Sequence, residues 1–139
     1  MTTDKPITGH CYCGEVHYKA SGPVLLRAEC LCRECQYITG GGSLHIMAVP
    51  LEGFALTKGA VQDFTRADLP RAVTRQFCPN CGTHLFTRAP AMPTAIIIKV
   101  GSLDDPSVYG GPDSANFGCD AQAWHRLPDD IPVFQKWGR

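Results

Sequence analysis

Three cysteines stand unusually close together in the stretch "ECLCRECQYITGG", residues 29–41, where Cys30, Cys32 and Cys35 form a C-x-C-x-x-C pattern. Cysteine sulfur is a preferred ligand of zinc, and this short spacing lets several sulfurs reach one ion. Three protein ligands leave the fourth position of a tetrahedral zinc to water, to a substrate thiol or to another protein group. Four side chains elsewhere in the chain are candidates for that fourth ligand: His10, His17, His45 and Cys119. If one of them closes the shell, the site is structural.

The charge of such a site limits its chemistry. Three thiolates around Zn²⁺ leave about one negative charge, so the ion is a poor Lewis acid for ionising water. The open position suits a fourth soft ligand, and a thiol bound there loses its proton at neutral pH while staying nucleophilic. The pattern therefore predicts a site that handles thiols.

Four other cysteines form two pairs that are far apart in the sequence. Cys11 and Cys13 make C-x-C in "GHCYCGEV", and Cys78 and Cys81 make C-x-x-C in "FCPNCGTHL", where Gly82 allows the backbone turn after the second sulfur. Two such pairs typically enclose a structural zinc, which would pin an N-terminal hairpin to the middle of the chain. The alternatives are a thioredoxin-like redox motif or buried thiols. A redox C-x-x-C is expected where a strand meets a helix, whereas this one lies between two strand-like runs.

Length and composition predict one globular domain over residues 1–139, with 44% hydrophobic and 19% charged residues. Thirteen basic and thirteen acidic residues give zero net charge, which argues against a nucleic-acid binder. The longest apolar run, "AIIIKV", is broken by Lys99 and is too short to span a bilayer. No secretory signal is recognisable at the N-terminus, so a cytoplasmic location is expected. In that compartment clustered cysteines typically bind metal or react rather than form disulfides, and the lone Cys119 is expected to be buried.

Short segments rich in Val, Ile, Phe and Thr lie between frequent glycines and prolines, as is typical of β-strands. The predicted strands cover residues 15–20, 23–29, 43–49, 54–59, 61–66, 72–77, 84–89 and 94–103. Residues 32–38 and 105–109 each favour a single helical turn. No window of a dozen residues has the apolar stripe of an amphipathic helix. The sequence thus predicts a mainly β fold of two packed, mostly antiparallel sheets.

The chain resembles the glutathione-dependent formaldehyde-activating enzymes, whose domain is shared with centromere protein V. The resemblance rests on "GHCYCGEVHY", "CLCRECQYITG", "FCPNCGTHLF" and "AWHRLPDDIPVFQKW", which occur in the family's order. It implies the β-tent (Mss-four-like) fold, a complex of antiparallel β-sheets built around zinc. It also implies one structural zinc on Cys11, Cys13, Cys78 and Cys81, and a second zinc on Cys30, Cys32 and Cys35 that belongs to the glutathione site.

The activity implied by the resemblance is a carbon–sulfur lyase reaction run in reverse, which joins glutathione and formaldehyde to give S-(hydroxymethyl)glutathione. Cys30, Cys32 and Cys35 would be its catalytic residues. The glutathione sulfur would become the fourth zinc ligand, lose its proton and attack the aldehyde carbon. Family members commonly read C-H-C-x-x-C at this motif, and here Leu31 replaces the histidine. All three sulfurs are kept, while a polar group beside the site is lost.

Glutathione also carries two carboxylates, which need donors. Arg33, Arg71 and Arg75 can each receive a carboxylate, with a solvated surface role as the alternative. The backbone N–H groups of the turn at Thr39, Gly40 and Gly41 are a further candidate, with a plain flexible turn as the alternative. Three aromatic side chains are expected to pack the C-terminal tail onto the sheets, or else to form a ligand wall: Trp124, Phe134 and Trp137.

Two functions of different class remain. The first is a zinc enzyme that acts on glutathione adducts, with formaldehyde or another small electrophile as co-substrate. The second is a zinc-stabilised module that binds glutathione or a protein partner without turnover. A zinc-ribbon nucleic-acid binder is disfavoured by the zero net charge and by the lack of interleaved basic and aromatic residues.

Overall fold

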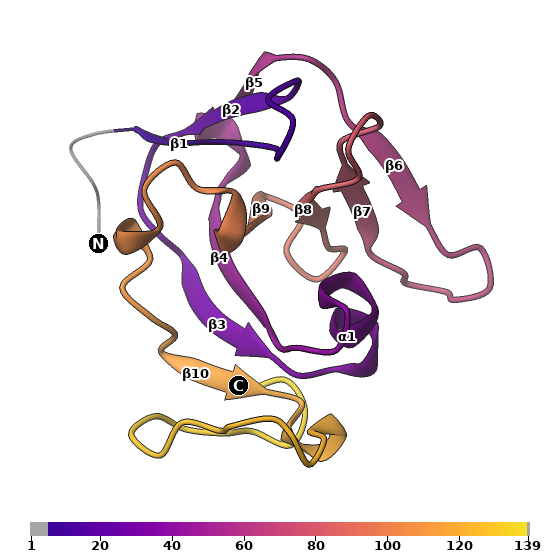
Figure 1. Cartoon of the computed structure of the whole chain (residues 1–139), viewed down its shortest axis with the longest axis vertical. Helices are drawn as coiled ribbons and strands as arrows, with labels where there is room; N and C mark the ends of the chain where they lie inside the picture. The colour runs from indigo at the N-terminus through magenta and orange to yellow at the C-terminus, as the bar shows by residue number, and fades with distance from the viewer. Residues whose placement is uncertain (1–5, 139) are drawn as a thin grey trace.

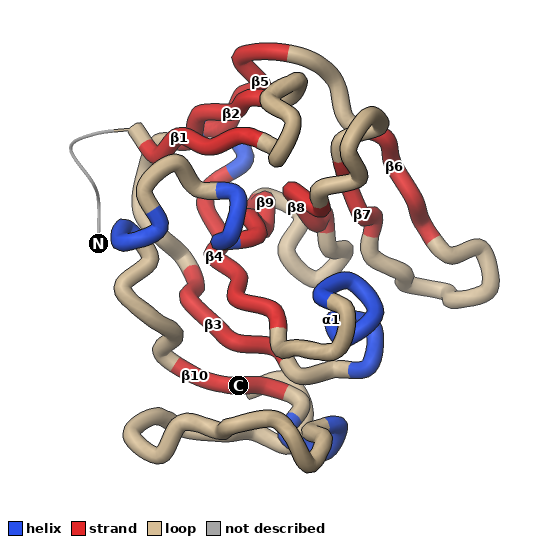
Figure 2. The backbone as a smooth tube through the Cα atoms, in the orientation of Figure 1, coloured by secondary structure: helices blue, strands red, loops and turns tan. Residues whose placement is uncertain are grey.

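The computed structural model describes residues 6–138, in which short β-strands form two sheets (Figures 1 and 2). A three-stranded antiparallel sheet has the order β1-β2-β5, with β1 at Ile7–His10, β2 at His17–Ala20 and β5 at Phe54–Lys58. A seven-stranded sheet has the order β10-β3-β4-β9-β8-β7-β6. Its strands are β3 (Leu26–Cys30), β4 (Leu44–Pro50), β6 (Gln62–Thr65), β7 (Thr74–Phe77), β8 (His84–Arg88), β9 (Ala95–Lys99) and β10 (Ser114–Asn116). All of its pairings are antiparallel except that of β10 with β3.

The helical elements are short. Helix α1 spans Arg33–Thr39, between β3 and β4. Four 3₁₀ turns complete the described chain: η1 (Leu51–Gly53), η2 (Val100–Ser102), η3 (Pro106–Val108) and η4 (Gly118–Asp120). None of the helices in residues 6–138 is both long enough and apolar enough to cross a bilayer.

The main core lies between the two sheets and is centred on Tyr18. This buried ring packs edge-on against Phe86, with ring centroids 4.9 Å apart, and its hydroxyl lies 2.7 Å from Ser102 Oγ. A buried hydroxyl needs such a partner, so the contact fixes the smaller sheet against the η2 turn. Gly9 makes this approach possible, because a Cβ at that position would lie 2.2 Å from the Tyr18 hydroxyl.

A second, smaller core lies where β3, α1, β4 and β9 meet. Its buried members are Ala28, Cys30, Cys35, Leu44, Ile46, Ala48 and Ile97. Helix α1 begins at Cys32, whose sulfur accepts the Cys35 N–H at 3.3 Å, and ends at Gly40, which has the left-handed conformation of a helix C-cap. So short a helix is not stable alone. The buried Gln36 holds it, because its side-chain amide donates to the carbonyls of Leu31 and Asp120 at 2.9 Å each.

The mainly β class and the two-sheet arrangement confirm the sequence predictions. Each of the eight predicted strands overlaps an observed strand, and the two predicted helical turns are α1 and η3. The strand predicted over 94–103 ends at Lys99, where the chain turns into η2. Strands β1 and β10 were not predicted, because each is short and depends on pairing with β2 or β3 for its extended form.

Candidate metal centres and the adjoining pocket

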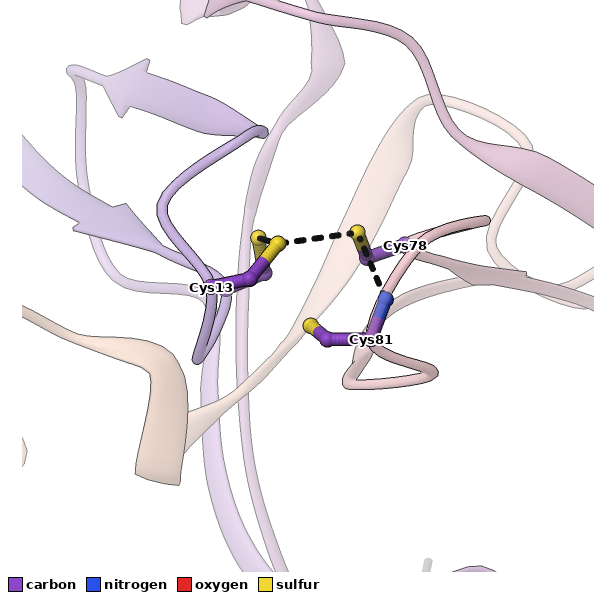
Figure 3. Close-up of side chains that lie close together, drawn as sticks. Cys13, Cys78 and Cys81 are labelled. Carbon is purple, nitrogen blue, oxygen red and sulfur yellow. Dashed lines mark hydrogen bonds between the residues drawn. The ribbon is translucent and has the colours of Figure 1, made fainter.

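The first candidate centre is the four-cysteine cluster, formed by Cys11, Cys13, Cys78 and Cys81 (Figure 3). Its ligand atoms all lie within 4.8 Å of one another, with 3.6 Å between the sulfurs of Cys11 and Cys13 and 3.8 Å between those of Cys13 and Cys78. A tetrahedral zinc with bonds of about 2.3 Å separates its sulfurs by about 3.8 Å. All eight cysteines are free thiols. This donor set therefore fits one enclosed zinc ion.

Backbone N–H groups point at the sulfurs of this cluster. Val16 N donates to Cys11 Sγ at 3.3 Å, and the N–H groups of Asn80 and Cys81 donate to Cys78 Sγ at 3.4 Å each. Such contacts favour the ionised sulfur and fix its direction. Both turns therefore direct backbone donors at the sulfurs of the cluster.

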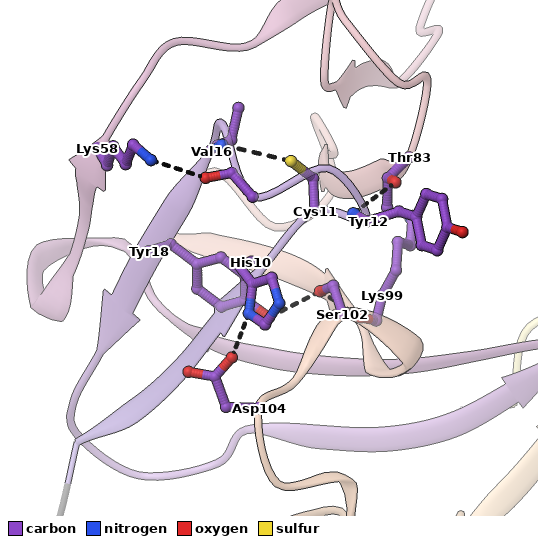
Figure 4. A network of polar contacts seen from close by, with 11 residues as sticks. His10, Cys11, Tyr12, Val16, Tyr18, Lys58, Thr83, Lys99, Ser102 and Asp104 are labelled. Atoms are coloured by element: carbon purple, nitrogen blue, oxygen red, sulfur yellow. Dashed lines mark hydrogen bonds and ion pairs between the residues drawn. The ribbon is translucent and has the colours of Figure 1, made fainter.

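Thr83 connects the two halves of the cluster. Its hydroxyl lies 3.1 Å from Cys81 Sγ and accepts the Tyr12 N–H at 3.0 Å, a contact that Figure 4 shows. The hydrogen bond from Thr83 lowers the pKa of Cys81 to about 6, so this thiol ionises readily at neutral pH. Gly82 has a φ of 79°, which confirms the left-handed turn predicted after the second sulfur of the C-x-x-C motif.

The second candidate centre is the cysteine triad, formed by Cys30 at the end of β3, Cys32 and Cys35. All three ligand atoms lie within 4.8 Å, and the sulfurs of Cys32 and Cys35 are 3.2 Å apart. The contact with the Cys30 thiol lowers the pKa of Cys32. Contacts among the three sulfurs raise the pKa values of Cys30 and Cys35. One thiol therefore ionises easily, and all three ionise together only around a cation. The triad accordingly fits a metal ion.

No fourth side chain of residues 6–138 closes the triad. His45 lies 3.1 Å from the Tyr109 hydroxyl, and His10 stacks on His17 at 5.1 Å. The prediction that Cys119 is buried is wrong: it is the central residue of η4, is exposed and belongs to neither cluster. Of the candidates for a fourth ligand, only a bound molecule remains.

A pocket of about 940 Å³ adjoins the triad, which forms part of its wall. Among residues 6–138, its charged lining is five cations and a single carboxylate: Arg33, Arg66, Arg71, Arg75, Lys99 and Glu34. Because the whole chain has zero net charge, this excess of positive charge is a local property of the pocket. Such a lining suits an anionic ligand.

The arginines of the pocket differ in how free they are. Arg75 Nη2 donates to Glu34 Oε1 at 2.7 Å, which ties β7 to α1, and Arg66 is paired with a neighbouring aspartate. Arg33 and Arg71 have no ion pair among the residues described by the structure. Arg33 also donates to Gln36 Oε1 and lies over the Tyr37 ring, so Arg71 is the less engaged of the two guanidinium groups that have no carboxylate partner.

Lys99 also lines the pocket, and it was not among the residues predicted from the sequence. It is 5% exposed, at the end of β9, and its Nζ donates to Thr87 Oγ1. Burial lowers the pKa of Lys99 to about 8, with Arg75 adding to the effect and the triad opposing it. Nearby, His84 Nδ1 is buried without a hydrogen-bond partner. The available signal was the charge inside an otherwise apolar strand, since lysine is rarely buried without a reason.

The glycine-rich turn after α1 does not reach the pocket lining. The N–H groups of Gly40 and Gly41 donate to the Gln36 carbonyl, and the Thr39 hydroxyl also faces that carbonyl. The Gly41 carbonyl accepts the Trp124 indole N–H at 2.9 Å. The groups expected to bind a carboxylate are thus occupied in capping the helix and holding the tail, which disfavours that expectation.

The C-terminal tail forms one wall of the pocket. Phe117 and Trp137 both line it and pack edge-on, with ring centroids 5.9 Å apart. The tail runs beside β10, where Gly118 N donates to the Phe134 carbonyl (Figure 1). Trp124 and Phe134 are absent from the lining, so of the three aromatic side chains singled out in the sequence only Trp137 is a wall residue.

Comparison with known proteins places these features in a family. Residues 6–121 match the family described as glutathione-dependent formaldehyde-activating enzyme. Among solved structures, a Rhodobacter sphaeroides protein from a structural genomics programme has a similar fold, with a TM-score of 0.58 and 16% sequence identity. The likeness covers 91% of this chain and 98% of that protein's chain. No curated protein sequence matches the chain.

Proposed function

The chain belongs to the glutathione-dependent formaldehyde-activating family, and on that premise we propose that it joins the glutathione thiol to formaldehyde reversibly. The product is S-(hydroxymethyl)glutathione, and the reverse reaction is that of a carbon–sulfur lyase. The observation that carries the proposal is a triad of sulfurs with no fourth protein ligand in the described chain, opening onto a cation-lined pocket. A small anionic thiol matches both features.

Zinc would have two different roles in this protein. Cys11, Cys13, Cys78 and Cys81 would enclose a structural ion, and Cys30, Cys32 and Cys35 would hold the ion of the reaction site. At the reaction site zinc supplies the positive charge that keeps an additional sulfur ionised at neutral pH.

The pocket arginines would orient the tripeptide. Glutathione has two carboxylates, and a guanidinium can bind each of them through two parallel hydrogen bonds. Arg33 on α1 and Arg71 in the β6–β7 loop are free of ion pairs and are assigned this task. Arg75 stays bound to Glu34 and keeps α1 in place. Holding the tripeptide fixes its sulfur beside the triad, which replaces a chance encounter by an oriented one.

Lys99 would donate a hydrogen bond to the oxygen of the aldehyde. As the sulfur attacks, a carbon–sulfur bond forms and the π-electron pair of the carbonyl moves to oxygen, which then takes a proton. A preformed donor at that oxygen lowers the barrier most where water is excluded. Lys99 is a buried cation in the wall that also contains the triad, and it is the one lysine of the described residues that lines the pocket.

Exchange NMR tests the proposal, by following the interconversion of formaldehyde and its glutathione adduct with and without the zinc-loaded protein. Because the uncatalysed reaction proceeds by itself, the expected result is a rate that rises in proportion to protein concentration. Cys32→Ser should abolish the increase, and Cys119→Ser, in an exposed thiol outside both clusters, should leave it unchanged. Glutathione binding without any acceleration would instead support the binding module.

A further inference from the structure

Several large, exposed apolar side chains line the pocket. Among the residues described, ten large apolar side chains are exposed, and four of the ten line this one pocket. Their exposed fractions are 79% for Tyr37, 57% for Phe64, 40% for Leu69 and 49% for Trp137. Scattered apolar side chains are normal on a protein surface, but a group of them around a concave site marks a binding surface.

These side chains come from three separate parts of the chain. Tyr37 lies on α1, Phe64 and Leu69 on β6 and the loop that follows, and Trp137 in the C-terminal tail. Trp137 packs against Phe117, the single non-glycine residue of the described chain with a positive φ, at 60°. A bulky residue in this conformation is strained, and such strain is found where a site requires a side chain in one direction. The apolar wall is thus assembled at some cost in free energy.

The two reactants considered so far do not use this wall. Glutathione is largely amide, carboxylate and ammonium, which the arginines and the triad already match. Formaldehyde contributes one carbon and has no apolar substituent. A cavity of about 940 Å³ is at the upper end of the range for small-molecule sites, and its apolar side would remain filled with water. Burying apolar surface is the main source of affinity that such side chains can offer.

We propose that the same site also accepts apolar aldehydes, which carry an alkyl or aryl group in place of a hydrogen of formaldehyde. The inference rests on the proposed function, because it places the apolar group beside a glutathione sulfur held at the triad. The apolar group packs among Phe64, Leu69 and Trp137. The sulfur–carbon bond forms, the carbonyl π pair moves to oxygen, and that oxygen takes up a proton in place of the one the thiol released. The product is an S-(1-hydroxyalkyl)glutathione, and no oxidant or reductant is needed.

Stable thioethers of glutathione test this inference by binding alone. Calorimetry on the zinc-loaded full chain compares glutathione, S-methylglutathione and S-hexylglutathione. Each fully buried methylene strengthens binding by about fourfold. The hexyl compound, partly buried, should therefore bind at least about tenfold more tightly than the methyl compound. Equal affinity for the two thioethers would overturn the inference while glutathione binding still supported the proposed function.

Two matched variants locate the effect. Leu69→Ser removes an apolar side chain of the pocket wall, and Leu127→Ser removes one of similar exposure, 44%, that does not line the pocket. Leu69→Ser and Phe64→Ser should each reduce the preference for the hexyl compound by about threefold or more, and Leu127→Ser should leave it intact. Both wall residues are exposed, so the variants should fold. A preference unchanged in Leu69→Ser and Phe64→Ser contradicts the inference.

Two further outcomes would also count against it. If sedimentation shows a dimer that dissociates in Leu69→Ser, the occupant of the wall is a second copy of the chain and the aldehyde is excluded. If glutathione and both thioethers fail to bind, the proposed function fails and the inference fails with it.

Discussion

The four-cysteine cluster and the cysteine triad offer the same kind of ligand, a cysteine sulfur, but differ in the surroundings of their sulfurs. The four-cysteine cluster joins segments 65 residues apart, as measured from Cys13 to Cys78, and supplies the four sulfurs that an enclosed zinc ion requires. The cysteine triad lies within six positions of one strand–helix junction and is one sulfur short. A cluster that connects distant segments contributes to folding, whereas one built within a single segment contributes little and is free to bind substrate.

The groups that contact the two sets of sulfurs also differ. Backbone N–H groups and the Thr83 hydroxyl face the sulfurs of the four-cysteine cluster, and none of its cysteines lines the pocket. All three cysteines of the triad line the pocket, together with Lys99 and the free arginines. The different surroundings, more than the type of ligand, are therefore the reason to propose a structural role for the four-cysteine cluster and a reactive role for the triad.

The largest expected effect is on stability, from Cys81→Ser. Loss of one ligand of the four-cysteine cluster should lower the free energy of unfolding by at least about 3 kcal/mol, because structural zinc contributes much of the stability of small domains. Thermal denaturation followed by circular dichroism measures it. Cys119→Ser, an exposed thiol outside both clusters, is the control and should change stability by no more than about 0.5 kcal/mol. Equal stability of the two variants would contradict the structural role.

Cys32→Ser should distinguish the role of the triad from that of the four-cysteine cluster. Serine is itself a good N-cap, so α1 keeps its first hydrogen bond while the triad loses a ligand. We expect zinc content to fall from two ions to one per chain, glutathione to bind at least about tenfold more weakly, and the melting temperature to stay within a few degrees. Elemental analysis gives the zinc content, titration calorimetry the affinity for glutathione, and thermal denaturation the melting temperature. Unfolding to the same degree as Cys81→Ser would remove the distinction between the centres.

Lys99→Met tests the cation of the pocket. Methionine keeps most of the apolar stem and removes the charge, so zinc content and folding should be unchanged. The rate of adduct exchange measured by NMR should fall about 10- to 100-fold, because the oxygen of the aldehyde loses its donor. Lys19→Met, on the exposed face of β2, is the matched control. An unchanged rate in Lys99→Met would leave the buried cation without a catalytic role.

The smallest expected effect belongs to Arg71→Ala. The Arg71 guanidinium is exposed and has no ion pair among the described residues, so its contribution to carboxylate binding is screened by solvent. The dissociation constant of glutathione should rise about three- to tenfold, and less at high salt. Arg126→Ala, also exposed but outside the pocket lining, should have no effect. Equal effects of the two variants would exclude a specific carboxylate contact.

The sequence was sufficient for features that depend on local spacing. The C-x-C and C-x-x-C pairs predict which sulfurs meet, because two turn-linked pairs can enclose one ion in only a few ways, and Gly82 marks the turn. The alternation of apolar residues predicts the strands, because it too is a property of short stretches of sequence.

Features that depend on distant packing could not be predicted. Lys99 is beside the triad because β9 pairs with β4 and β8, and Trp137 lines the pocket because the tail runs along β10. The glycine-rich turn suggested a carboxylate site, but its N–H groups cap α1 instead. Leu31, which replaces the usual histidine of the family, is fully buried and does not line the pocket, so the replacement leaves the wall of the pocket unaltered. The single-domain assignment and the cytoplasmic location stay predictions.

The long span of the four-cysteine cluster also sets an order of events during synthesis. At about 5 to 20 residues per second, roughly 3 to 13 seconds separate the emergence of Cys13 from that of Cys78. Throughout this interval the first two thiols have no partners and are open to oxidation or to capture by copper. The Cys30, Cys32 and Cys35 motif is made within that interval, and the tail that forms one wall of its pocket is made after Cys78. The three sulfurs of the triad therefore emerge before the residues that enclose them on that side.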